Sequence, residues 1–539
     1  MPNPPPPEVV LSMKGLSIVL PGLRDRPHAV RDVSLDLRMG EILCIIGESG
    51  SGKSVTASAI MGLLPDAMRV EGGQVLFRGT DLLTLPEARM RTLRGKSVSI
   101  IFQDPLSALN PLMTIGAQIR EVLDAHHIGT IEGRAARVVE MLTEVGLPDP
   151  PAIQHQYPFR LSGGQRQRVM IAMALALDPD ILIADEPTTA LDVTTQAQIL
   201  SLIRAIQRRK GMSVLFITHD FGVVADIADR VVVMEKGLVV EQGDAAQVLR
   251  APAHAYTRKL IAAVPGLRDA DRPRDTEKPV VLEVRNLCKT YRTRSGFLSR
   301  VREVRAVDDI SFTLRKGETL GIVGESGSGK SSMGKVLMKL IPADGGEIRF
   351  QGENTVALTE DAFRPLRPRI QMIFQDPYAS LNPRFTVGQA LTVGPVAHAR
   401  LTRTAARRKA QEVLGMVGLD ASAFDRYPHE FSGGQRQRVG IARALMFDPE
   451  VIVADEAVSA LDVSIQAQVL DLLNDIQRRT RLAMVFITHD LRVASQICDD
   501  VLVMHRGRMV EYGPPSQIFR APRHAYTRSL VDAIPGRAA

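Results

Sequence analysis

The chain has 539 residues, of which 45% are hydrophobic and 24% charged, as in an ordinary globular protein of several domains. This composition excludes a disordered, collagen-like or disulfide-stapled chain. The 67 Lys and Arg residues against 60 Asp and Glu leave a net charge of +7, which permits an anionic partner without requiring one. Aromatic residues make up only 4% and Trp is absent, so a base-stacking platform for nucleic acid is not expected.

The amino-terminal residues 1–8 are rich in proline and are predicted to form a disordered arm without the apolar segment of a secretory signal. No apolar run approaches the ~18 residues that cross a bilayer, so a role at a membrane would need a spanning partner. Cys44, Cys288 and Cys498 form no Cys-x-x-Cys pair, which argues against a zinc ribbon or a disulfide framework. This cysteine usage favours a reducing, cytoplasmic compartment.

An apolar run at residues 42–46 ends at a glycine and is predicted to be a buried strand. Gly47 to Ser54 follow it and match the phosphate-binding pattern G-x-x-x-x-G-K-S/T. The glycines let backbone N–H groups point at a phosphate, and the positive end of the next helix faces the same point. Lys53 supplies a charge for the β- and γ-phosphates, and the Ser54 hydroxyl can bind Mg²⁺. The alternative is a chance glycine-rich turn, which a second match at Gly324 to Ser331 argues against. The predicted phosphate-binding residues are Gly47, Glu48, Ser49, Gly50, Ser51, Gly52, Lys53, Ser54, Gly324, Glu325, Ser326, Gly327, Ser328, Gly329, Lys330 and Ser331.

Gln103 lies in the segment Phe102-Gln-Asp-Pro105. A neutral amide there could contact both Mg²⁺ and an attacking water without adding charge, although Gln-Asp-Pro is also an ordinary turn. Helical periodicity between Gln103 and Ser162, for example over residues 134–145, predicts an inserted helical subdomain.

Ser162, Gly163, Gly164 and Gln165 open a predicted helix that ends near residues 178–179. Serine is a good N-cap, and the glycines leave N–H groups uncovered at the start of the helix, which makes a second anion site. The alternative is a plain N-cap with flexible glycines. Because each nucleotide already has a phosphate loop, a second anion site is best explained if it covers the nucleotide of another copy.

Two further apolar runs end in polar residues, where ligands bind in a parallel sheet. Residues 181–184 precede Asp185 and Glu186, and residues 214–217 precede His219. Asp185 could hold Mg²⁺ through water, Glu186 could polarise the attacking water, and His219 could contact the γ-phosphate. Alternatively, Asp-Glu-Pro could begin a helix, and a lone histidine could be structural.

The whole unit recurs with a period of about 270 residues, which indicates two tandem copies of one domain. We expect a first domain at 9–267, a charged linker at 268–279 and a second domain at 280–539. The segment His254-Ala-Tyr-Thr-Arg258 also returns, as His524 to Arg528. The other second-copy counterparts are apolar runs at 319–323, 451–454 and 485–487, and Gln375, Ser432, Gly433, Gly434, Gln435, Asp455, Glu456 and His489.

Together with Ala-Leu-Asp192 and Ala-Leu-Asp462, these motifs resemble the ATP-binding-cassette (ABC) ATPases over both halves of the chain. The Ser-Gly-Gly-Gln signature makes this resemblance specific. It implies an α/β fold of two tandem P-loop NTPase (RecA-like) nucleotide-binding domains. Each would carry an inserted helical subdomain and an antiparallel β subdomain. It also implies an ATPase that uses ATP and Mg²⁺, with the metal held by Ser54, Gln103, Asp185, Ser331, Gln375 and Asp455.

A finer resemblance links the chain to the dipeptide, oligopeptide and nickel importers, and to fused ATPases of glutathione importers. The likeness to the dipeptide, oligopeptide and nickel importers rests on the segments Gln103 to Pro111 and Gln375 to Pro383 and on the two His-Ala-Tyr-Thr-Arg segments, and the likeness to the glutathione importers rests on Asp455 to Asp462 and the fused two-cassette layout. This finer resemblance covers both halves of the chain. It implies ATP hydrolysis coupled to import of peptides or a related small solute, at the cytoplasmic face of the inner membrane. The implied partners are two transmembrane permease subunits and an extracytoplasmic solute-binding protein, with no nucleic acid. No iron–sulfur cluster is expected, because the cysteine cluster of some relatives is absent.

The resemblance further implies head-to-tail pairing of the halves, so that each ATP lies between the phosphate loop of one half and the signature of the other. In the family an early aromatic residue stacks on adenine. Tyr291 fits this role in the second half, but Leu20 aligns with it in the first, which is expected to hold adenine less firmly. The first site would combine Lys53, Ser54, Gln103, Asp185, Glu186 and His219 with Ser432, Gly434 and Gln435. The second would combine Lys330, Ser331, Gln375, Asp455, Glu456 and His489 with Ser162, Gly164 and Gln165.

Two alternative functions compete with import. A soluble twin-cassette ATPase that acts on ribosomes or nucleic acid usually has a long charged helical linker or zinc-binding cysteines, and this sequence has neither. An exporter ATPase is disfavoured by the Asn-Pro and His-Ala-Tyr-Thr-Arg segments. The sequence therefore favours an importer ATPase with two active sites.

Overall fold

The computed structural model describes residues 8–20, 26–189, 191–268, 271–272, 277–293, 302–376, 379–398, 400–459 and 461–536. The predicted arm except Glu8, half of the predicted linker (residues 269–270 and 273–276), and Ala190 and Ala460 of the Ala-Leu-Asp segments lie outside the described residues. The chain divides into two compact units: unit 1 holds most of the chain up to Val264, and unit 2 runs mainly from Pro265 to Ile534.

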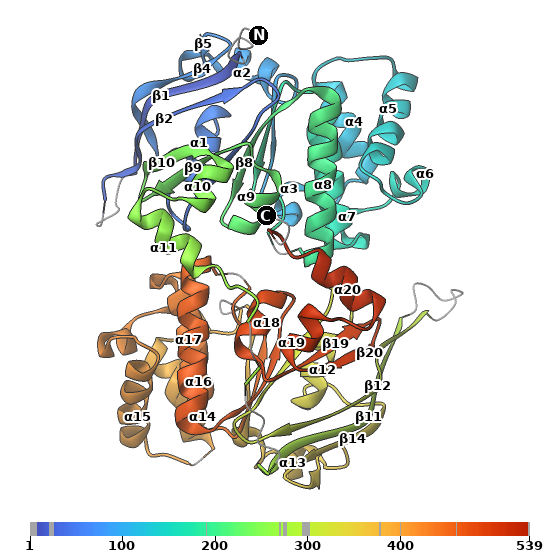
Figure 1. The fold of residues 1–539 in the computed structure, drawn as a ribbon, viewed down its shortest axis with the longest axis vertical. Helices are drawn as coiled ribbons and strands as arrows, with labels where there is room; N and C mark the ends of the chain where they lie inside the picture. The colour runs from blue at the N-terminus through green and yellow to red at the C-terminus, as the bar shows by residue number, and fades with distance from the viewer. Residues whose placement is uncertain are drawn as a thin grey trace. The chain divides into compact units, whose positions relative to one another are not determined.

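The centre of unit 1 is a six-stranded sheet formed, in this order, by β10 (Leu238–Asp244), β9 (Arg230–Glu235), β3 (Ile42–Ile46), β8 (Ser213–Thr218), β7 (Ile181–Asp185) and β6 (Val98–Ile101) (Figure 1). Neighbouring strands are parallel except β9 and β10. The strands predicted from the apolar runs are thereby confirmed, and β7 and β8 are neighbours. The residues that follow them consequently meet at one edge of the sheet.

Both faces of this sheet are buried, which explains why its strands are continuous apolar runs rather than alternating ones. In β3, Cys44 and Ile46 belong to the core cluster on the helical side, whereas Leu43 and Ile45 belong to the cluster shared with the second sheet. All four side chains have no exposed surface. Burial of an aliphatic side chain of this size contributes about 1.5–3 kcal/mol.

A four-stranded antiparallel sheet packs against one of these faces and supplies the predicted β subdomain. Its strands are, in order, β2 (His28–Arg38), β1 (Val9–Val19), β4 (Arg69–Phe77) and β5 (Thr80–Asp81). The helices α3 to α6 lie between β6 and the signature segment, where periodicity predicted the inserted helical subdomain. The helices of unit 1 are α1 (Lys53–Ile60), α2 (Glu87–Leu93), α3 (Pro105–Ala108), α4 (Ile115–Ala125), α5 (Ile131–Glu144), α6 (Pro150–Ile153), α7 (Gly163–Leu175), α8 (Val193–Lys210), α9 (Phe221–Ile227), α10 (Ala245–Arg250) and α11 (Ala255–Ala263), with 3₁₀ turns at Leu82–Thr84 and Pro158–Arg160.

Unit 2 repeats this architecture (Figure 1). Its six-stranded sheet contains, in order, β16 (Ile370–Ile373), β17 (Val451–Asp455), β18 (Ala483–Ile487), β13 (Thr319–Val323), β19 (Asp500–His505) and β20 (Arg508–Gly513). Its antiparallel sheet contains β12 (Arg302–Arg315), β11 (Val280–Thr293), β14 (Gly345–Phe350) and β15 (Glu353–Asn354). Its helices are α12 (Lys330–Leu337), α13 (Glu360–Phe363), α14 (Val387–Ala397), α15 (Arg403–Met416), α16 (Gly433–Leu445), α17 (Val463–Thr480), α18 (Leu491–Ile497), α19 (Pro515–Arg520) and α20 (Ala525–Asp532), with 3₁₀ turns at Arg367–Arg369, Ala421–Asp425 and Pro428–Glu430.

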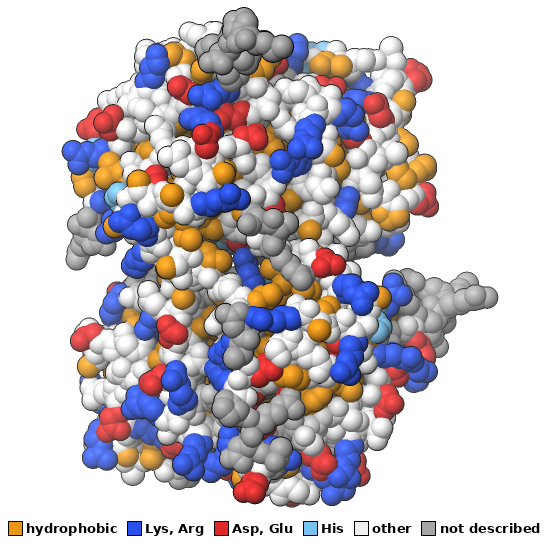
Figure 2. Space-filling model, viewed as in Figure 1, with side chains coloured by type: hydrophobic (Ala, Val, Ile, Leu, Met, Phe, Trp, Pro, Cys, Tyr) orange, Lys and Arg blue, Asp and Glu red, His pale blue; other side chains and the backbone are white. Residues whose placement is uncertain are grey.

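Positively and negatively charged side chains are intermingled on the surface. On the viewed face of each unit, Lys and Arg side chains are interspersed with Asp and Glu (Figure 2). Among the described residues, none of the helices has the length and apolar character that a bilayer crossing demands.

Candidate active site

Each phosphate loop connects a central strand to a helix and closes around its own lysine. In unit 1 the loop runs from the end of β3 to the start of α1, and Lys53 Nζ donates to the backbone oxygens of Gly47 (2.7 Å) and Glu48 (3.0 Å). Lys330 of unit 2 makes the corresponding bonds at 2.7 and 2.8 Å. Burial lowers the pKa of Lys330, an effect that the neighbouring Glu456 carboxylate opposes. The lysine of each unit is thus held inside its loop by two backbone carbonyl oxygens.

The last glycine of each loop has a backbone conformation that a side chain would disturb. Gly52 has φ 103° and Gly329 has φ 107°, and each is the N-cap of the helix that follows. A Cβ at Gly329 would lie 1.8 Å from the carbonyl oxygen of Ala306. Only glycine fits here, which explains the residue type at this position of the motif.

A serine hydroxyl and a buried aspartate meet beside each phosphate loop. Ser54 Oγ donates to Asp185 Oδ1 at 3.0 Å, and Ser331 Oγ donates to Asp455 Oδ1 at 3.1 Å. Burial raises the pKa of both aspartates above the ordinary value, and the serine hydrogen bond opposes this shift. Paired hard oxygen donors of this kind suit Mg²⁺.

Glu186 has a left-handed backbone conformation directly after β7, with φ 47°, and Glu456 has φ 48° in unit 2. The backbone N–H of Glu186 donates to the carbonyl oxygen of Ile217 on β8 at 3.0 Å. The alternative that Asp-Glu-Pro begins a helix is therefore wrong, because the next helix, α8, begins only at Val193. A side-chain-bearing residue costs free energy in this region, so the strained backbone marks this position as a candidate functional site.

Three neighbouring polar groups contact the same carboxylate oxygen of Glu186. Gln103 Nε2 donates to Oε2 at 2.9 Å, Thr189 Oγ1 donates to it at 3.0 Å, and His219 Nδ1 lies 3.3 Å away. Burial raises the pKa of Glu186, but the hydrogen bond and charge of His219, with Lys53 and Thr189, outweigh it and lower the pKa to about 2. The structure therefore brings together the glutamine, glutamate and histidine that the sequence singled out in three separate segments.

Glu456 of unit 2 has a similar but not identical environment. Gln375 Nε2 donates to its Oε2 at 2.7 Å, and His489 Nδ1 lies 3.4 Å from its Oε1. Ser459 stands where unit 1 has Thr189, and its hydroxyl donates at 3.1 Å to the backbone oxygen of Glu456 rather than to the carboxylate. Burial acts to raise the pKa of Glu456, but His489 and Lys330 bring it below the ordinary value. Burial likewise acts to lower the pKa of His489, and Glu456 raises it.

The signature segments begin helices, as predicted. Ser162 is the N-cap of α7: its Oγ accepts from the Gln165 N–H at 3.3 Å, and Gln165 Oε1 accepts from the Ser162 N–H at 3.0 Å. Ser432 and Gln435 form the same capping box on α16. A Cβ at Gly434 would lie 2.4 Å from a methyl carbon of Ile465, so this glycine permits close packing as well as uncovered N–H groups. The plain N-cap is thus present at both signature segments.

A tyrosine to which the sequence assigned no role contacts each phosphate loop. The Tyr256 hydroxyl accepts from the Glu48 backbone N–H at 3.3 Å, and the Tyr526 hydroxyl accepts from the Glu325 N–H at 3.0 Å. His254 places Tyr256 by capping α11: its Nδ1 accepts from the Tyr256 N–H at 3.2 Å. The available signal was the duplicated His-Ala-Tyr-Thr-Arg segment, whose structural role now becomes clear.

The two residues at the predicted adenine position differ in exposure. Tyr291 on β11 is 38% exposed, and its hydroxyl lies 3.4 Å from Ser332 Oγ, next to the phosphate loop. Leu20 is partly buried and packs against the core cluster of unit 1. An accessible aromatic ring is therefore present at this position in unit 2, while unit 1 has an aliphatic side chain there.

Comparison with known proteins assigns both halves to one family. Residues 30–189 and 307–459 match the family "ABC transporter", and residues 240–297 and 510–538 match "Oligopeptide/dipeptide transporter, C-terminal region". The segments with Tyr256 and Tyr526 lie within these C-terminal matches.

Relatives match over nearly the whole length. The "Peptidoglycan transport ATP-binding protein YejF" of Agrobacterium fabrum is 48% identical over 97% of this chain and 96% of its own. The "Glutathione import ATP-binding protein GsiA" of Salmonella choleraesuis and that of Escherichia coli K12 are each 48% identical over 98% of this chain and 89% of their own. The solved dimeric bacterial ABC transporter cassette MJ0796 is 29% identical over 44% of this chain and 98% of its own, with a TM-score of 0.40. The chain belongs to the ABC transporter family, as an ATPase with two ATP-binding cassettes.

Proposed function

We propose that the chain is the ATP-hydrolysing subunit that powers the import of peptides or a related small solute through a membrane ABC transporter. Both copies match the oligopeptide/dipeptide transporter C-terminal region, and relatives that match over nearly the full length are named for glutathione import and peptidoglycan transport. The observation that carries the hydrolytic part is the carboxylate with its glutamine and histidine neighbours, which is present in both units. We therefore infer two active sites rather than one active and one degenerate site.

In this proposal Glu186 and Glu456 orient and deprotonate the attacking water. The three polar groups contact only Glu186 Oε2, so the base would act through Oε1, or through Oε2 once one of these groups has turned away. Gln103 is exposed on a loop and is the donor best placed to turn away. Loss of its hydrogen bond, and a turn of His219 toward the γ-phosphate, would raise the pKa of Glu186 and make it a better base.

The remaining residues of each site bind and orient the nucleotide. Lys53 would exchange its two carbonyl contacts for β- and γ-phosphate oxygens, and the glycine-rich loop would present backbone N–H groups. Ser54 and Asp185 would hold Mg²⁺, directly and through water, with Gln103 as a further ligand. When bound, that ion would neutralise charge on the transferring phosphoryl group. Lys330, Ser331, Asp455 and Gln375 would take these roles in unit 2.

We further propose that each ATP is completed by the signature of the opposite unit: Ser432, Gly434 and Gln435 for the first site, and Ser162, Gly164 and Gln165 for the second. The uncovered N–H groups of Gly163 and Gly433 at the starts of α7 and α16 support this role. ATP then favours the closed pairing because both units bind it, and hydrolysis removes that preference. The permease would be driven by this difference between states.

The proposed partners are two permease subunits, gripped near the Gln103 and Gln375 loops, and indirectly a solute-binding protein. The subunit would act peripherally at the cytoplasmic face of the cell membrane. The test is reconstitution with the permeases and binding protein in proteoliposomes, followed by measurement of ATP hydrolysis with glutathione, dipeptides and longer peptides. We expect one of these solutes to stimulate hydrolysis severalfold and to accumulate in the lumen. Hydrolysis without solute-dependent accumulation would reject import while leaving the ATPase assignment intact.

A further inference from the structure

The segment that leads from unit 1 into unit 2 is anchored on unit 2. Unit 2 begins at Pro265, and we call residues 266–268, 271 and 272 the anchor segment. The Leu267 side chain packs against the core cluster of the helical side of unit 2. Further along, Asp271 Oδ1 accepts from the Ser516 N–H of α19 at 3.0 Å. Apolar and polar contacts therefore make the anchor segment part of the folded unit.

Most hydrogen bonds of the anchor segment go to one short helix, α18, which packs beside α19 (Figure 1). The Arg268 N–H donates at 2.8 Å to the hydroxyl of Ser495, which is only 1% exposed. Gln496 Nε2 donates to the backbone oxygen of Gly266 at 2.5 Å. The backbone oxygen of Gln496 in turn accepts from the guanidinium groups of Arg268 and Arg272. The anchor segment thus holds the carboxyl end of α18.

These contacts satisfy groups that a helix cannot satisfy by itself. The last carbonyl oxygens of a helix have no partner within it, and a cation near them also interacts favourably with the helix dipole. A helix of seven residues has few internal hydrogen bonds, so its position depends on what it packs against. Arg272 also pairs at 3.5 Å with Asp499, whose other carboxylate oxygen accepts from the Thr319 N–H at the start of β13. The anchor segment therefore connects α18 to the strand that leads into the phosphate loop.

Unit 1 satisfies the corresponding carbonyl oxygen with an arginine of its own. The backbone oxygen of Asp226, at the equivalent place in α9, accepts from Arg204 on α8. Unit 2 has Asn474 in place of Arg204, and its Oδ1 accepts from Arg272 Nη2 at 2.9 Å. The same structural requirement is thus met from within the cassette in unit 1 and by linker arginines in unit 2.

The other end of α18 lies directly behind the histidine of the second site. His489 is two residues before the start of the helix, and Asp490 between them accepts from the Arg492 N–H at 2.8 Å. His489 Nδ1 lies 3.4 Å from Glu456 Oε1. The helix is about 10 Å long and four of its side chains have no more than 1% exposed surface, so a shift at one end is transmitted to the other.

We propose that the anchor segment positions His489. Arg268 and Arg272 hold the carboxyl end of α18, and α18 determines where the imidazole lies relative to Glu456. Hydrolysis in the second site therefore responds to the linker, whereas the first site depends on Arg204 of its own unit. The inference rests on the proposed role of His489 at the γ-phosphate. The two linker arginines are positioning residues, because they act through α18.

The first test uses the full chain, labelled with ¹⁵N in its histidine side chains. Signals of His489 and His219 are assigned with His489→Gln and His219→Gln. In the double variant Arg268→Gln and Arg272→Gln, we expect the imidazole signals of His489 to move and those of His219 to stay. Adding Asn474→Arg supplies the arginine that unit 1 uses and should return the His489 signals to their parent positions. Thermal unfolding shows whether the variants are folded, and Arg272→Gln alone is a milder variant that should act in the same direction.

The second test is kinetic. The double variant should lower kcat for ATP hydrolysis about twofold, because one of two sites is slowed, with KM little changed. Asn474→Arg should restore kcat, and Arg408→Gln, at an exposed arginine of α15, is the control.

The proposal is overturned if the folded double variant keeps the parent signals of His489 or if Asn474→Arg does not restore them. A rise in KM at unchanged kcat would also overturn it. A parent chain without ATP hydrolysis would reject the proposed function, whereas the histidine signals would still decide this inference.

Discussion

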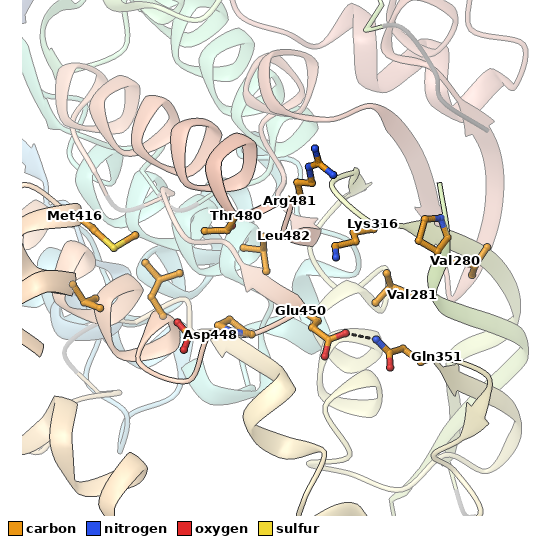
Figure 3. Close-up of a pocket in the computed structure, with 14 residues that line it drawn as sticks. Val280, Val281, Lys316, Gln351, Met416, Asp448, Glu450, Thr480, Arg481 and Leu482 are labelled. Atoms are coloured by element: carbon orange, nitrogen blue, oxygen red, sulfur yellow. Dashed lines mark hydrogen bonds between the residues drawn. The ribbon is translucent and has the colours of Figure 1, made fainter. Parts of the chain in front are cut away.

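The two units agree at the carboxyl edge of their central sheets and differ at the amino edge. At the carboxyl edge the serine–aspartate distances are 3.0 and 3.1 Å, the glutamine–glutamate distances 2.9 and 2.7 Å, and the histidine–glutamate distances 3.3 and 3.4 Å. At the amino edge unit 1 has a cavity of about 330 Å³, where Arg78 pairs with Asp180, and unit 2 has a cavity of about 540 Å³ (Figure 3), where Arg369 pairs with Glu450. The motif residues repeat at the carboxyl edge, whereas the residues at the amino edge differ between the units and give each unit its own ion pairs.

Even the carboxyl edge contains differences that test how equivalent the two sites are. Thr189 bonds to the carboxylate of its glutamate, whereas Ser459 bonds to the backbone. Tyr291 offers an aromatic face where unit 1 has Leu20. These differences predict sites with the same chemistry but different nucleotide affinity.

The largest effect is expected from removal of the proposed bases. Glu186→Gln combined with Glu456→Gln should lower steady-state hydrolysis by about 10²–10⁴-fold while ATP still binds. If the two sites are equivalent, each single variant should lose the same fraction of the steady-state hydrolysis rate. Phosphate release and fluorescent-nucleotide binding measure the two properties, with Glu347→Gln, at a partly exposed glutamate of β14 that pairs with Arg349, as a control. Substantial turnover by the double variant would refute the assignment of the bases.

Tyr291→Ala should weaken ATP binding to unit 2 by about 5–30-fold, because loss of base stacking on an aromatic ring costs roughly 1–2 kcal/mol. Tyr291→Phe keeps the ring and should stay within about twofold of the parent. Nucleotide titration in the background of the two Gln variants measures binding without turnover. If Tyr291→Ala binds ATP as tightly as the parent does, the ring contributes no stacking energy, and the two units hold adenine alike.

Tyr256→Phe and Tyr526→Phe each remove one hydrogen bond to a phosphate loop, which is worth about 1 kcal/mol. We expect KM for ATP to rise about three- to fivefold with kcat little changed, and the larger effect at Tyr526, whose bond is shorter. Tyr157→Phe, at an exposed tyrosine, is the control. Parallel losses of kcat and thermal stability without a change in KM would instead indicate a purely structural role.

Lys210→Thr introduces the unit 2 residue into unit 1 and should lower stability by about 0.5–1 kcal/mol at neutral pH. Burial raises the pKa of Asp178, but Lys210 and Arg137 outweigh it and bring the pKa below the ordinary value. A lowered carboxylate pKa stabilises the folded state above the ordinary pKa, and this contribution is lost as the pH falls through the folded value. The difference between parent and variant in urea unfolding should therefore shrink below about pH 4. A difference that stays constant with pH would exclude this linkage.

Much of the fold could be predicted because the motifs follow short apolar strands. The runs at 42–46, 181–184 and 214–217 are strands β3, β7 and β8, since both faces of the sheet are buried and no polar residue interrupts them. The parallel arrangement then placed Asp185, Glu186 and His219 near one another. Internal repetition supplied the second unit directly.

Features that depend on distant segments could not be predicted. The hydrogen bond between Tyr256 and Glu48 joins residues 208 positions apart, and neither segment has a sequence pattern that predicts contact with the other. The left-handed backbone of Glu186 differs from the helix start that the local sequence suggests, because the Glu186 N–H donates to the carbonyl oxygen of Ile217 on the adjacent strand. The unit 2 cavity could not be predicted from the sequence either, because its lining comes from segments far apart in the chain, including β11, α15, α16 and α17.

The positive φ angles of Glu186 and Glu456 have a genetic consequence. A single base change converts a glutamate codon to a glycine codon, and glycine is the residue that adopts this conformation most readily. We expect such alleles to give subunits that fold, bind ATP and occupy their assembly partners without turning over. In a cell that also makes the intact chain, these subunits would act as dominant-negative inhibitors rather than as simple null alleles.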